Sequence, residues 1–421
     1  MPEGLLPLLH ARHHQPGDER SPDNDLTNWK RVMRIAQLAP LAEAVPPKLY
    51  GGTERVVSWL TEELVDIGHE VTLFASGDSI TNAVLQPCSP QALRLDPIHH
   101  DPMLAYGVAL AQIADQASQF DVVHSHIDWV HIPLLRRLGV PFVTTLHGRL
   151  DLPDLNGSFE NCFAEAPFVS ISNAQRKPLP QAHWAGTVYH GLPKDLLKPN
   201  FAPEGYLAFL GRIAPEKGPE TAIRLARAAG IPLKIAAKVD RVDQAYFDTK
   251  VSSLIDGKDI EFVGEIDEPQ KAAFLGNAAA LLFPICWPEP FGLVVIEAMA
   301  CGTPVIAFRC GSVPELIEEG VTGFVVDSCR DALSAMDRAA VIDRRAVRAS
   351  FERRFTARRM AEEYVRVYES LSDHCRSDMG SIRFGGKLRP PRASMLSRTP
   401  VPIHACGRSL EPTNDISDPA T

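Results

Sequence analysis

The feature that most constrains the fold of this chain is an alternation of short apolar runs with helical patterns. In the longer segments, apolar residues recur at helical spacing, as at Val56, Leu60 and Leu64, which predicts amphipathic helices. The shorter runs are rich in β-branched residues and predict buried strands: "RIAQLA" (34–39), "EVTLFAS" (70–76), "DVVHSH" (121–126) and "PFVTTLHG" (141–148). Strands that alternate with helices in this way predict a parallel sheet covered on both faces.

The alternation starts again after a proline-rich segment that has no period. Strand-like runs return: "YLAFLGR" (206–212), "PLKIAAK" (232–238), "IEFVGE" (260–265), "ALLFPI" (280–285), "PVIAF" (304–308) and "TGFVVD" (322–327). Helical patterns occur among them at 218–230, 292–301 and 312–319. We therefore predict an α/β protein with two tandem Rossmann-like, doubly wound domains facing a cleft. The predicted parts are an N-terminal domain at 33–190, a linker at 191–204 and a C-terminal domain at 205–357.

The two ends of the chain differ from its middle. Residues 1–32 and 372–421 are polar and lack a period, with too few apolar side chains to offset the entropy cost of ordering. We expect a disordered N-terminal extension and a disordered tail, the tail following a closing helix at 358–371. Met33, directly before the first strand, is either an ordinary strand-edge residue or an alternative start of the chain.

Composition narrows the functional classes. The chain has 43 basic and 52 acidic residues, a formal net charge of −9, which argues against nucleic acid or an anionic membrane surface as the main partner. A peripheral membrane contact remains compatible with it. The eight cysteines form no Cys-x-x-Cys pair, and no apolar run approaches the roughly 20 residues of a membrane span. We expect a cytoplasmic protein.

The loops after the predicted strands are the candidate ligand site, because doubly wound domains bind ligands beyond the carboxyl ends of their strands. In "KLYGGTERVV", Gly51 and Gly52 precede a helix, and their amides could face an anion without a side chain in between. A loop glycine pair without a ligand is the alternative. The pattern Gly-x-Gly-x-x-Gly is absent from the chain, which counts against a dinucleotide dehydrogenase.

The loop "LGRIAPEKG" (210–218) opens the C-terminal domain. Arg212 and Lys217 lie in it, after the domain's first predicted strand. A guanidinium binds phosphate oxygens as a fork and an ammonium as a point charge, so the pair could clamp a diphosphate. A solvated basic pair on a surface loop is the alternative.

The segment "EPFGLVVIEAMACG" (289–302) places two glutamates around a predicted helix start. The amides of Phe291, Gly292 and Leu293 would be free to bind phosphate. Glu297, further into the helix, would accept hydrogen bonds from paired hydroxyls such as a ribose diol. Glu289, in the preceding loop, could reach the sugar end of the same ligand. The alternative is a loop carboxylate at Glu289 and a buried ion-pair partner at Glu297.

The histidines of "DVVHSH" are candidate metal ligands. His124 and His126 share one face of the predicted strand. A third ligand at compatible spacing is not evident, and the one Asp-x-Asp, Asp23 to Asp25, falls in the N-terminal extension. We therefore predict no metal site, and we expect His126 to line the cleft as a hydrogen-bonding group.

Together these motifs resemble glycosyltransferase family 4, whose members are retaining enzymes of the GT-B fold. Three segments carry the resemblance, in order within residues 33–371: "GGTERVVSWLTEELVDIGHEVTLFA", "GRIAPEKG" and "EPFGLVVIEAMACGTPVIAFRCGSVPELIEEGVTGFVVD". Within the family, "PPKLYGGTERVVSWLTEEL" is similar to bacterial members described as UDP-glucose:tetrahydrobiopterin glucosyltransferases.

The resemblance implies roles for the matching positions. Arg212 and Lys217 would hold the donor diphosphate, and Glu297 would bind the donor ribose. Glu289 would hold the donor sugar and phosphate, together with the backbone amides of Phe291, Gly292 and Leu293.

Further positions match the family outside these two loops. His147 in "TTLHG" matches a histidine near the donor sugar and the reacting centre, and Gly51 and Gly52 match glycines that approach the donor phosphates and the acceptor. Val263, in "FVGEID" (262–267), matches the strand end that meets the nucleotide base. The sequence departs from the family at Ile285, where a serine usually follows the proline.

The resemblance implies a hexosyltransferase that moves a sugar, expected to be glucose, from a UDP-sugar to an unidentified small-molecule, glycan or lipid acceptor. The reaction would be retaining and metal-independent, with no cofactor besides the nucleotide-sugar substrate. Two alternatives stay open. One is a GT-B relative with other chemistry, a nucleotide-sugar epimerase or a phosphorylase, although no lysine stands out for pyridoxal phosphate. The other is a non-catalytic sugar-nucleotide-binding protein, which would be expected to lack some of the four charged residues of the two loops.

Overall fold

The computed structural model of this chain describes residues 31–48, 51–96, 98, 101–153 and 155–381. The predicted disorder of the N-terminal extension and of the tail falls largely outside the described residues and stays a prediction. Among the described residues, no helix combines the length and the apolar character needed to cross a membrane.

The N-terminal half contains a seven-stranded sheet of order β3-β2-β1-β4-β5-β6-β7, with every neighbouring pair parallel. Its strands are β1 (Arg34–Leu38), β2 (Glu70–Ser76), β3 (Val84–Ser89), β4 (Val122–Ser125), β5 (Phe142–Thr145), β6 (Phe168–Ser170) and β7 (Trp184–Thr187). Its helices are α1 (Gly52–Ile67), α2 (Pro102–Gln116), α3 (Ile132–Leu138), α4 (Leu155–Ser158) and α5 (Asn173–Arg176).

Helix α1 shows how the sequence pattern becomes local structure. Val56, Leu60 and Leu64, one helical turn apart, are all buried, so one apolar stripe faces the sheet. The helix ends at Ile67 and is capped by Gly68, whose φ of 100° lies in the left-handed region. The Gly68 amide donates to the carbonyls of Leu64 and Val65. The chain then enters β2 directly.

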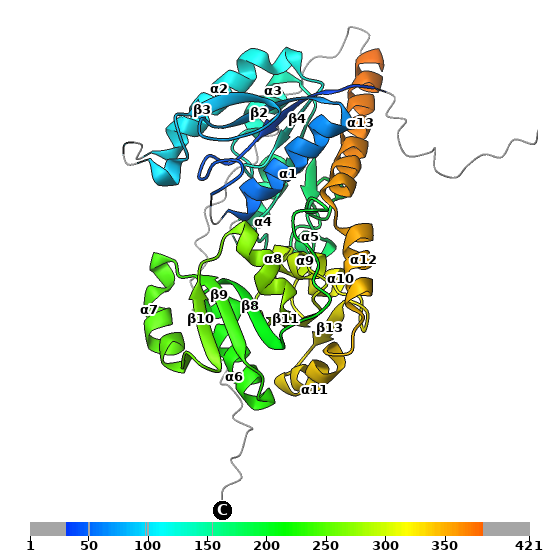
Figure 1. The fold of residues 1–421 in the computed structure, drawn as a ribbon. Coiled ribbons are helices and arrows are strands. Elements are labelled where there is room, and N and C mark those ends of the chain that lie inside the picture. Colours follow the sequence, from blue (N-terminus) through cyan, green and yellow to red (C-terminus); the bar gives the residue numbers. More distant parts are fainter. Residues whose placement is uncertain (1–30, 49–50, 97, 99–100, 154, 382–421) are drawn as a thin grey trace, which may run out of the picture. The chain divides into compact units, whose positions relative to one another are not determined.

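The C-terminal half contains a six-stranded sheet of order β10-β9-β8-β11-β12-β13, again wholly parallel (Figure 1). Its strands are β8 (Tyr206–Arg212), β9 (Leu233–Lys238), β10 (Ile260–Gly264), β11 (Ala278–Phe283), β12 (Val305–Phe308) and β13 (Gly323–Val326). Its helices are α6 (Pro219–Ala229), α7 (Gln244–Tyr246), α8 (Glu268–Gly276), α9 (Leu293–Ala300), α10 (Val313–Leu316) and α11 (Cys329–Ala339). The predicted fold class, two Rossmann-like doubly wound domains, is confirmed.

Both sheets reverse their strand order at the first strand of the half, between β1 and β4 and between β8 and β11. In open parallel sheets, ligands bind beyond the carboxyl ends of the strands at such switch points. The loops that leave β1, β8 and β11 carry the motifs singled out in the sequence. The topology therefore gathers those motifs at the expected ends of the sheets.

Two helices close the described chain, α12 (Arg344–Arg354) and α13 (Ala357–Ser381). Helix α13 returns to the N-terminal sheet (Figure 1), where Tyr368 contacts Gln37 of β1 and Tyr364 contacts Thr145 of β5. The predicted closing helix at 358–371 is thus correct in kind, but its predicted end is wrong, because the helix continues to Ser381. Strands β3, β6 and β7 were not predicted.

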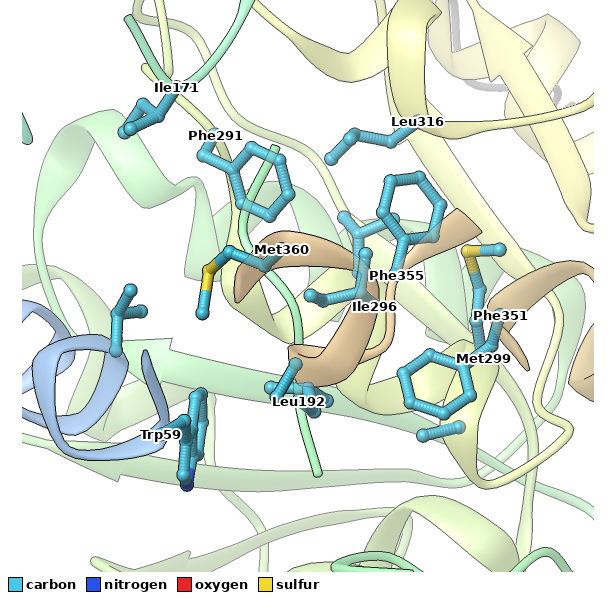
Figure 2. Close-up of a cluster of buried hydrophobic side chains, with 14 of the residues drawn as sticks. Trp59, Ile171, Leu192, Phe291, Ile296, Met299, Leu316, Phe351, Phe355 and Met360 are labelled. Carbon is cyan, nitrogen blue, oxygen red and sulfur yellow. The ribbon is translucent and has the colours of Figure 1, made fainter. Parts of the chain in front are cut away.

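One hydrophobic cluster connects the two halves. It contains Ile35 of β1, Val295 of α9 and Met360 of α13, all fully or almost fully buried. Figure 2 shows part of it, in which Phe291 and Phe355 lie near Met360. The loop that leads into α9, which contains Phe291, is thus packed in the same core as the closing helix α13, which contains Met360.

Candidate active site

A cavity of about 490 Å³ lies among the loops at the carboxyl ends of both sets of strands. It gathers ten of the site residues predicted from the sequence: Gly51, Gly52, His147, Arg212, Lys217, Glu289, Phe291, Gly292, Leu293 and Glu297. These residues come from four separate segments of the chain, so their convergence is a property of the fold. Their individual roles stay predictions.

Two predicted positions do not border the cavity. His126 is buried behind His147, to whose ring it is hydrogen bonded, so the expectation that it lines the cleft is not met. Alternation along a strand gives the face on which a side chain lies, not its depth below the surface. Val263 is 37% exposed on β10 and does not line the cavity. Glu265 and Ile266, just beyond that strand, do line it.

The basic loop after β8 is built around a glycine. Gly218 has a φ of 70°, and a Cβ there would lie 2.2 Å from the carbonyl oxygen of Pro284, so only glycine lets the two loops meet. Arg212 donates to Asp243 at 2.9 Å and to Glu216 at 2.6 Å. A diphosphate bound by Arg212 would compete with these two carboxylates.

Lys217 and Glu289 form an ion pair at the wall of the cavity. The Lys217 Nζ atom donates to Glu289 Oε2 at 2.5 Å, and the indole Nε1 of Trp287 donates to the same oxygen at 2.8 Å. The ammonium also lies 4.7 Å from the centre of the Trp287 ring, within the range of a cation–π contact. Trp287, in the "CWPEP" loop, was not singled out from the sequence, although a tryptophan beside a candidate glutamate was the available signal.

The loop before α9 is fixed from both halves of the chain. Ser312 donates to the carbonyl of Phe291, and Ser172 donates to the carbonyl of Pro290, each at 2.6 Å. Helix α9 starts after Gly292, which has a φ of 91° and caps the helix without a side-chain hydrogen bond. The first amides of a helix have no partner within it, so this end suits an anion in the cavity.

Glu297 lies about one turn into α9 and is 4% exposed. Its Oε1 accepts a hydrogen bond from Lys271 Nζ of α8 at 2.7 Å. Lys271 also lies 3.6 Å from Glu268, which pairs with Arg55 of α1. The ion-pair alternative for Glu297 is therefore present in the structure, and it coexists with the position of Glu297 on the cavity wall. No sequence signal indicated Lys271 or Arg55.

The cavity wall is nearly balanced in charge. Its basic side chains are Arg55, Arg94, Arg212, Lys217, Lys238 and Lys271. Its acidic side chains are Glu43, Glu54, Glu265, Glu289 and Glu297. Cations attract phosphate, and carboxylates accept hydrogen bonds from hydroxyls. The wall therefore suits a ligand that carries both groups.

A directed chain of hydrogen bonds fixes the ring of His147. Gln37 Nε2 donates to the Tyr368 hydroxyl at 3.3 Å, so Gln37 Oε1 accepts from His126 Nε2 at 2.9 Å. Because His126 is neutral and already carries its proton on Nε2, its Nδ1 accepts from His147 Nε2 at 2.9 Å. Burial lowers the pKa of His147 to about 3, so His147 is a neutral ring with its proton on Nε2.

The same network continues away from the cavity. The Tyr368 hydroxyl donates to His124 Nδ1, and His124 Nε2 donates to Thr145, each at 2.7 Å. His131 is held by Ser125 and Thr144. Among the described residues, no group of three or more histidine, cysteine, aspartate or glutamate side chains could hold a metal ion. Metal independence itself stays a prediction.

His190 is a further cavity residue that the sequence did not reveal. It directly follows Tyr189 at the start of the segment between the two halves, and it is 4% exposed. Its ring stacks on that of His147, with centroids 5.3 Å apart and planes at 19°. The sequence placed His190 at the boundary of a linker, where nothing distinguished it from a loop histidine.

Two family models match this chain. The model described as Glycosyl transferases group 1 matches residues 198–354, and the model described as Glycosyltransferase Family 4 matches residues 50–184. The matches fall in the C-terminal and N-terminal halves respectively, and together they span more than half of the chain.

Curated relatives match most of the chain at moderate identity. The D-inositol 3-phosphate glycosyltransferase of Mycolicibacterium smegmatis is 29% identical over 365 residues, which cover 72% of this chain and 81% of the relative. The glycogen synthase of Mycobacterium tuberculosis is 26% identical, covering 76% of this chain and 92% of the relative.

Solved structures share the fold. AviGT4, a glycosyltransferase involved in avilamycin A biosynthesis, superposes with a TM-score of 0.61 at 24% identity, covering 81% of this chain and 98% of AviGT4. HepE of Anabaena, solved in complex with UDP and glucose, gives a TM-score of 0.61 at 18% identity, covering 80% of this chain and all of HepE. The two-domain architecture is thus the one known as GT-B.

Proposed function

This chain belongs to glycosyltransferase family 4 and transfers a hexose, and we propose that it moves glucose from UDP-glucose to a hydroxylated acceptor, with retention and without a metal ion. The observation that carries the proposal is the convergence of Arg212, Lys217, Glu289 and Glu297 with the start of α9 on one cavity. Glucose and the uridine base rest on the resemblance of residues 46–64 to bacterial glucosyltransferases.

The arrangement of the cavity wall supports one orientation of the donor. Glu297, on the helix and paired with Lys271, would accept hydrogen bonds from the ribose hydroxyls. Arg212, Lys217 and the first amides of α9 would hold the diphosphate, because they supply positive charge between the two glutamates. Glu289, paired with Lys217, would then meet the sugar.

Same-face transfer follows from this orientation. The bond between the anomeric carbon and the diphosphate oxygen breaks first, and its electron pair leaves with UDP. The cations and amides stabilise the departing diphosphate, while the sugar carries the developing positive charge. The acceptor hydroxyl attacks from the side of the leaving group and passes its proton to a diphosphate oxygen. No glycosyl-enzyme intermediate forms.

Support for the class of acceptor comes from the curated relatives and from the N-terminal side of the cavity. The two curated relatives are named for inositol phosphate and for glycogen. These two compounds have in common only hydroxyl groups that could act as the nucleophile. On the N-terminal side, the cavity is lined by Glu43, Glu54 and Arg94, with Glu43 and Arg94 paired at 2.7 Å. Charged groups of this kind support a polyhydroxylated acceptor.

An assay of UDP release separates the candidate chemistries. The protein is incubated with UDP-glucose, with and without polyol and sugar acceptors, in the presence of excess chelator. We expect acceptor-dependent UDP release that survives the chelator, and an α-linked product. Interconversion of the sugar without UDP release would indicate an epimerase instead, and binding of UDP-glucose without turnover would indicate a non-catalytic protein. Turnover that is lost with chelator and restored by Mn²⁺ would overturn the metal-independent assignment.

A further inference from the structure

His190 is a buried polar side chain whose ring has no hydrogen-bond partner among the described residues. Its Nδ1 atom is sealed from solvent and unpartnered. Nε2 also has no bond to the described residues, and the ring contributes to the wall of the cavity. Buried polar atoms are almost always hydrogen bonded, so an unpaired ring at a ligand cavity points to a bond made with the ligand.

The ring is neutral, which fixes what it can offer. Burial, the nearby His147 and the nearby Arg359 hold the pKa of His190 well below its ordinary value. A neutral imidazole carries one N–H and one lone pair. A sealed N–H without an acceptor is rarer in proteins than a sealed acceptor without a donor. The proton is therefore assigned to Nε2, the atom that can reach a ligand.

The ring is also held rigidly between two residues of the site. It stacks on His147 and meets the edge of the Phe291 ring, with centroids 4.8 Å apart and planes at 62°. Phe291 directly precedes Gly292, the cap of α9. His190 is thus wedged between the histidine beside the predicted sugar site and the loop that leads into the predicted phosphate site.

The backbone next to His190 is clamped by the C-terminal helices. Arg359 of α13 donates to the carbonyl of His190 at 3.2 Å. A Cβ on Gly191 would lie 2.2 Å from the carbonyl oxygen of Thr356, so the two segments are in direct contact. Leu192 donates its amide to the carbonyl of Phe355 at 2.9 Å. A hydrogen-bond donor held in this way needs little reorganisation when charge develops in the reaction.

We propose that His190 is a further catalytic residue. Its Nε2–H donates a hydrogen bond to the oxygen of the nucleotide sugar that joins the transferred sugar to the diphosphate. The proposal rests on the proposed glycosyl transfer, and it adds a group that no motif indicated. Oxygen at this junction gains negative charge as the bond to the anomeric carbon breaks. The hydrogen bond is therefore strongest in the transition state and raises kcat more than it lowers KM.

Two substitutions separate the hydrogen bond from packing. His190→Phe keeps a flat ring between His147 and Phe291 but has no N–H. His190→Gln loses the ring, but its amide nitrogen reaches the position of Nε2. We expect the phenylalanine variant to lose roughly 10² to 10³ in kcat, as when one preorganised donor is removed. The glutamine variant should recover most of that loss.

The readouts are kcat and KM for UDP-glucose, the melting temperature, and the calorimetric affinity for UDP. Melting temperature should be unchanged in His190→Phe. UDP affinity should fall, because the junction oxygen stays on UDP as a charged β-phosphate oxygen that accepts the same hydrogen bond. A phenylalanine variant with wild-type kcat would show that the ring only packs and would overturn the proposal, and so would equal losses in both variants. If the wild-type protein itself turns over no UDP-sugar, the proposed function fails. His190 is then tested by whether His190→Phe weakens binding of UDP but not of UMP, which lacks the β-phosphate, and equal weakening of both would overturn it.

Discussion

At the scale of single residues, the pair Lys217 and Glu289 sets the electrostatics of the predicted sugar–phosphate junction. Lys217→Ala removes the ammonium that would face the diphosphate and leaves Glu289 with only the Trp287 indole. We expect kcat for UDP-glucose to fall by roughly 10² to 10³. The matched control is Lys258→Ala, because Lys258 is exposed and outside the cavity. Equal activity of the two variants in the UDP-release assay would contradict a role for Lys217 in the reaction.

The two glutamates should separate binding from turnover. Glu297→Gln keeps the shape of the side chain but weakens its acceptance of ribose hydroxyls, so KM for the donor should rise while kcat changes little. Glu289→Gln should lower kcat with little change in KM. Both variants should still give the α-linked product, which NMR of the anomeric proton would verify. A sugar trapped covalently on Glu289 would contradict the same-face mechanism.

Residues of the site were predictable where a motif falls at the end of a strand. Arg212 is the last residue of β8 and Glu289 follows β11, so their convergence could be predicted from strand order alone. Lys271 and His190 could not be found in that way, because their partners Glu297 and His147 lie 26 and 43 positions away in the chain. His126 lies directly after β4 on the same side as His124, as predicted, but it is buried behind His147 and does not reach the cavity.

At the scale of secondary-structure elements, β1, β4 and α13 meet in the hydrogen-bond chain behind His147. Gln37→Leu removes the group that orients His126, so the His147 ring is no longer held to one tautomer. We expect kcat to fall by roughly 10², the effect of a small misplacement in an active site. ¹⁵N NMR of the histidine rings should show a mixture of His147 tautomers.

A second substitution in the same network provides the control. Tyr364→Phe removes a hydroxyl that contacts Thr145 at 2.9 Å but leaves Gln37, His126 and His147 linked. It should lower the free energy of unfolding by about 1 kcal/mol, the value of a typical hydrogen bond, with kcat unchanged. Equal losses of kcat in Gln37→Leu and Tyr364→Phe would mean that the network matters only for stability.

Elements were predicted best where apolar runs are long and buried. The predicted ranges for β2 and β8 agree with the structure at both ends. Strand β7 has only half-buried residues at the edge of its sheet, so it lacks the apolar run of a central strand. Helix α12 is rich in arginine, yet Arg344 and Arg348 are buried because they donate to backbone carbonyls. A polar composition was therefore a poor guide to burial there.

At the scale of the whole molecule, buried neutral histidines make stability depend on pH. Burial lowers the pKa of both His131 and His147 from 6.5 to about 3. Below pH 6.5 the unfolded chain binds protons that the folded chain does not, so the free energy of unfolding falls as pH drops toward 3. Each such histidine contributes about 1.4 kcal/mol per pH unit in that window. Urea unfolding between pH 8 and pH 4 measures the effect.

The contribution of one histidine can be isolated. His131→Asn removes a ring held by Ser125 and Thr144, and it should be less stable than the wild type at pH 8. Its free energy of unfolding should also fall less steeply as the pH is lowered. The difference in slope should be the contribution of one histidine, about 1.4 kcal/mol per pH unit. An unchanged slope would show that other groups cause the acid sensitivity.

The extent of the folded chain can be tested by truncation. Residues 33–371 retain Tyr364 and Tyr368, and the pair lost at the N-terminal end, Arg31 with Asp121, is partly exposed and worth little. We expect this shortened chain to fold and to release UDP at the wild-type rate. Loss of soluble protein on removing residues 1–32 alone would show that the extension is structural.

The return of α13 to the first sheet also sets an order of assembly during synthesis. The ribosome makes β1, β4 and β5 early, but Tyr364 and Tyr368, which pair with Thr145, His124 and Gln37 of those strands, emerge hundreds of residues later. Domains usually fold as they are made, the first one first. In this chain we expect the first domain to stay incomplete until residues 364–368 have been translated, because buried polar groups of its sheet lack their partners until then. A premature stop in the second half would therefore leave both domains incomplete.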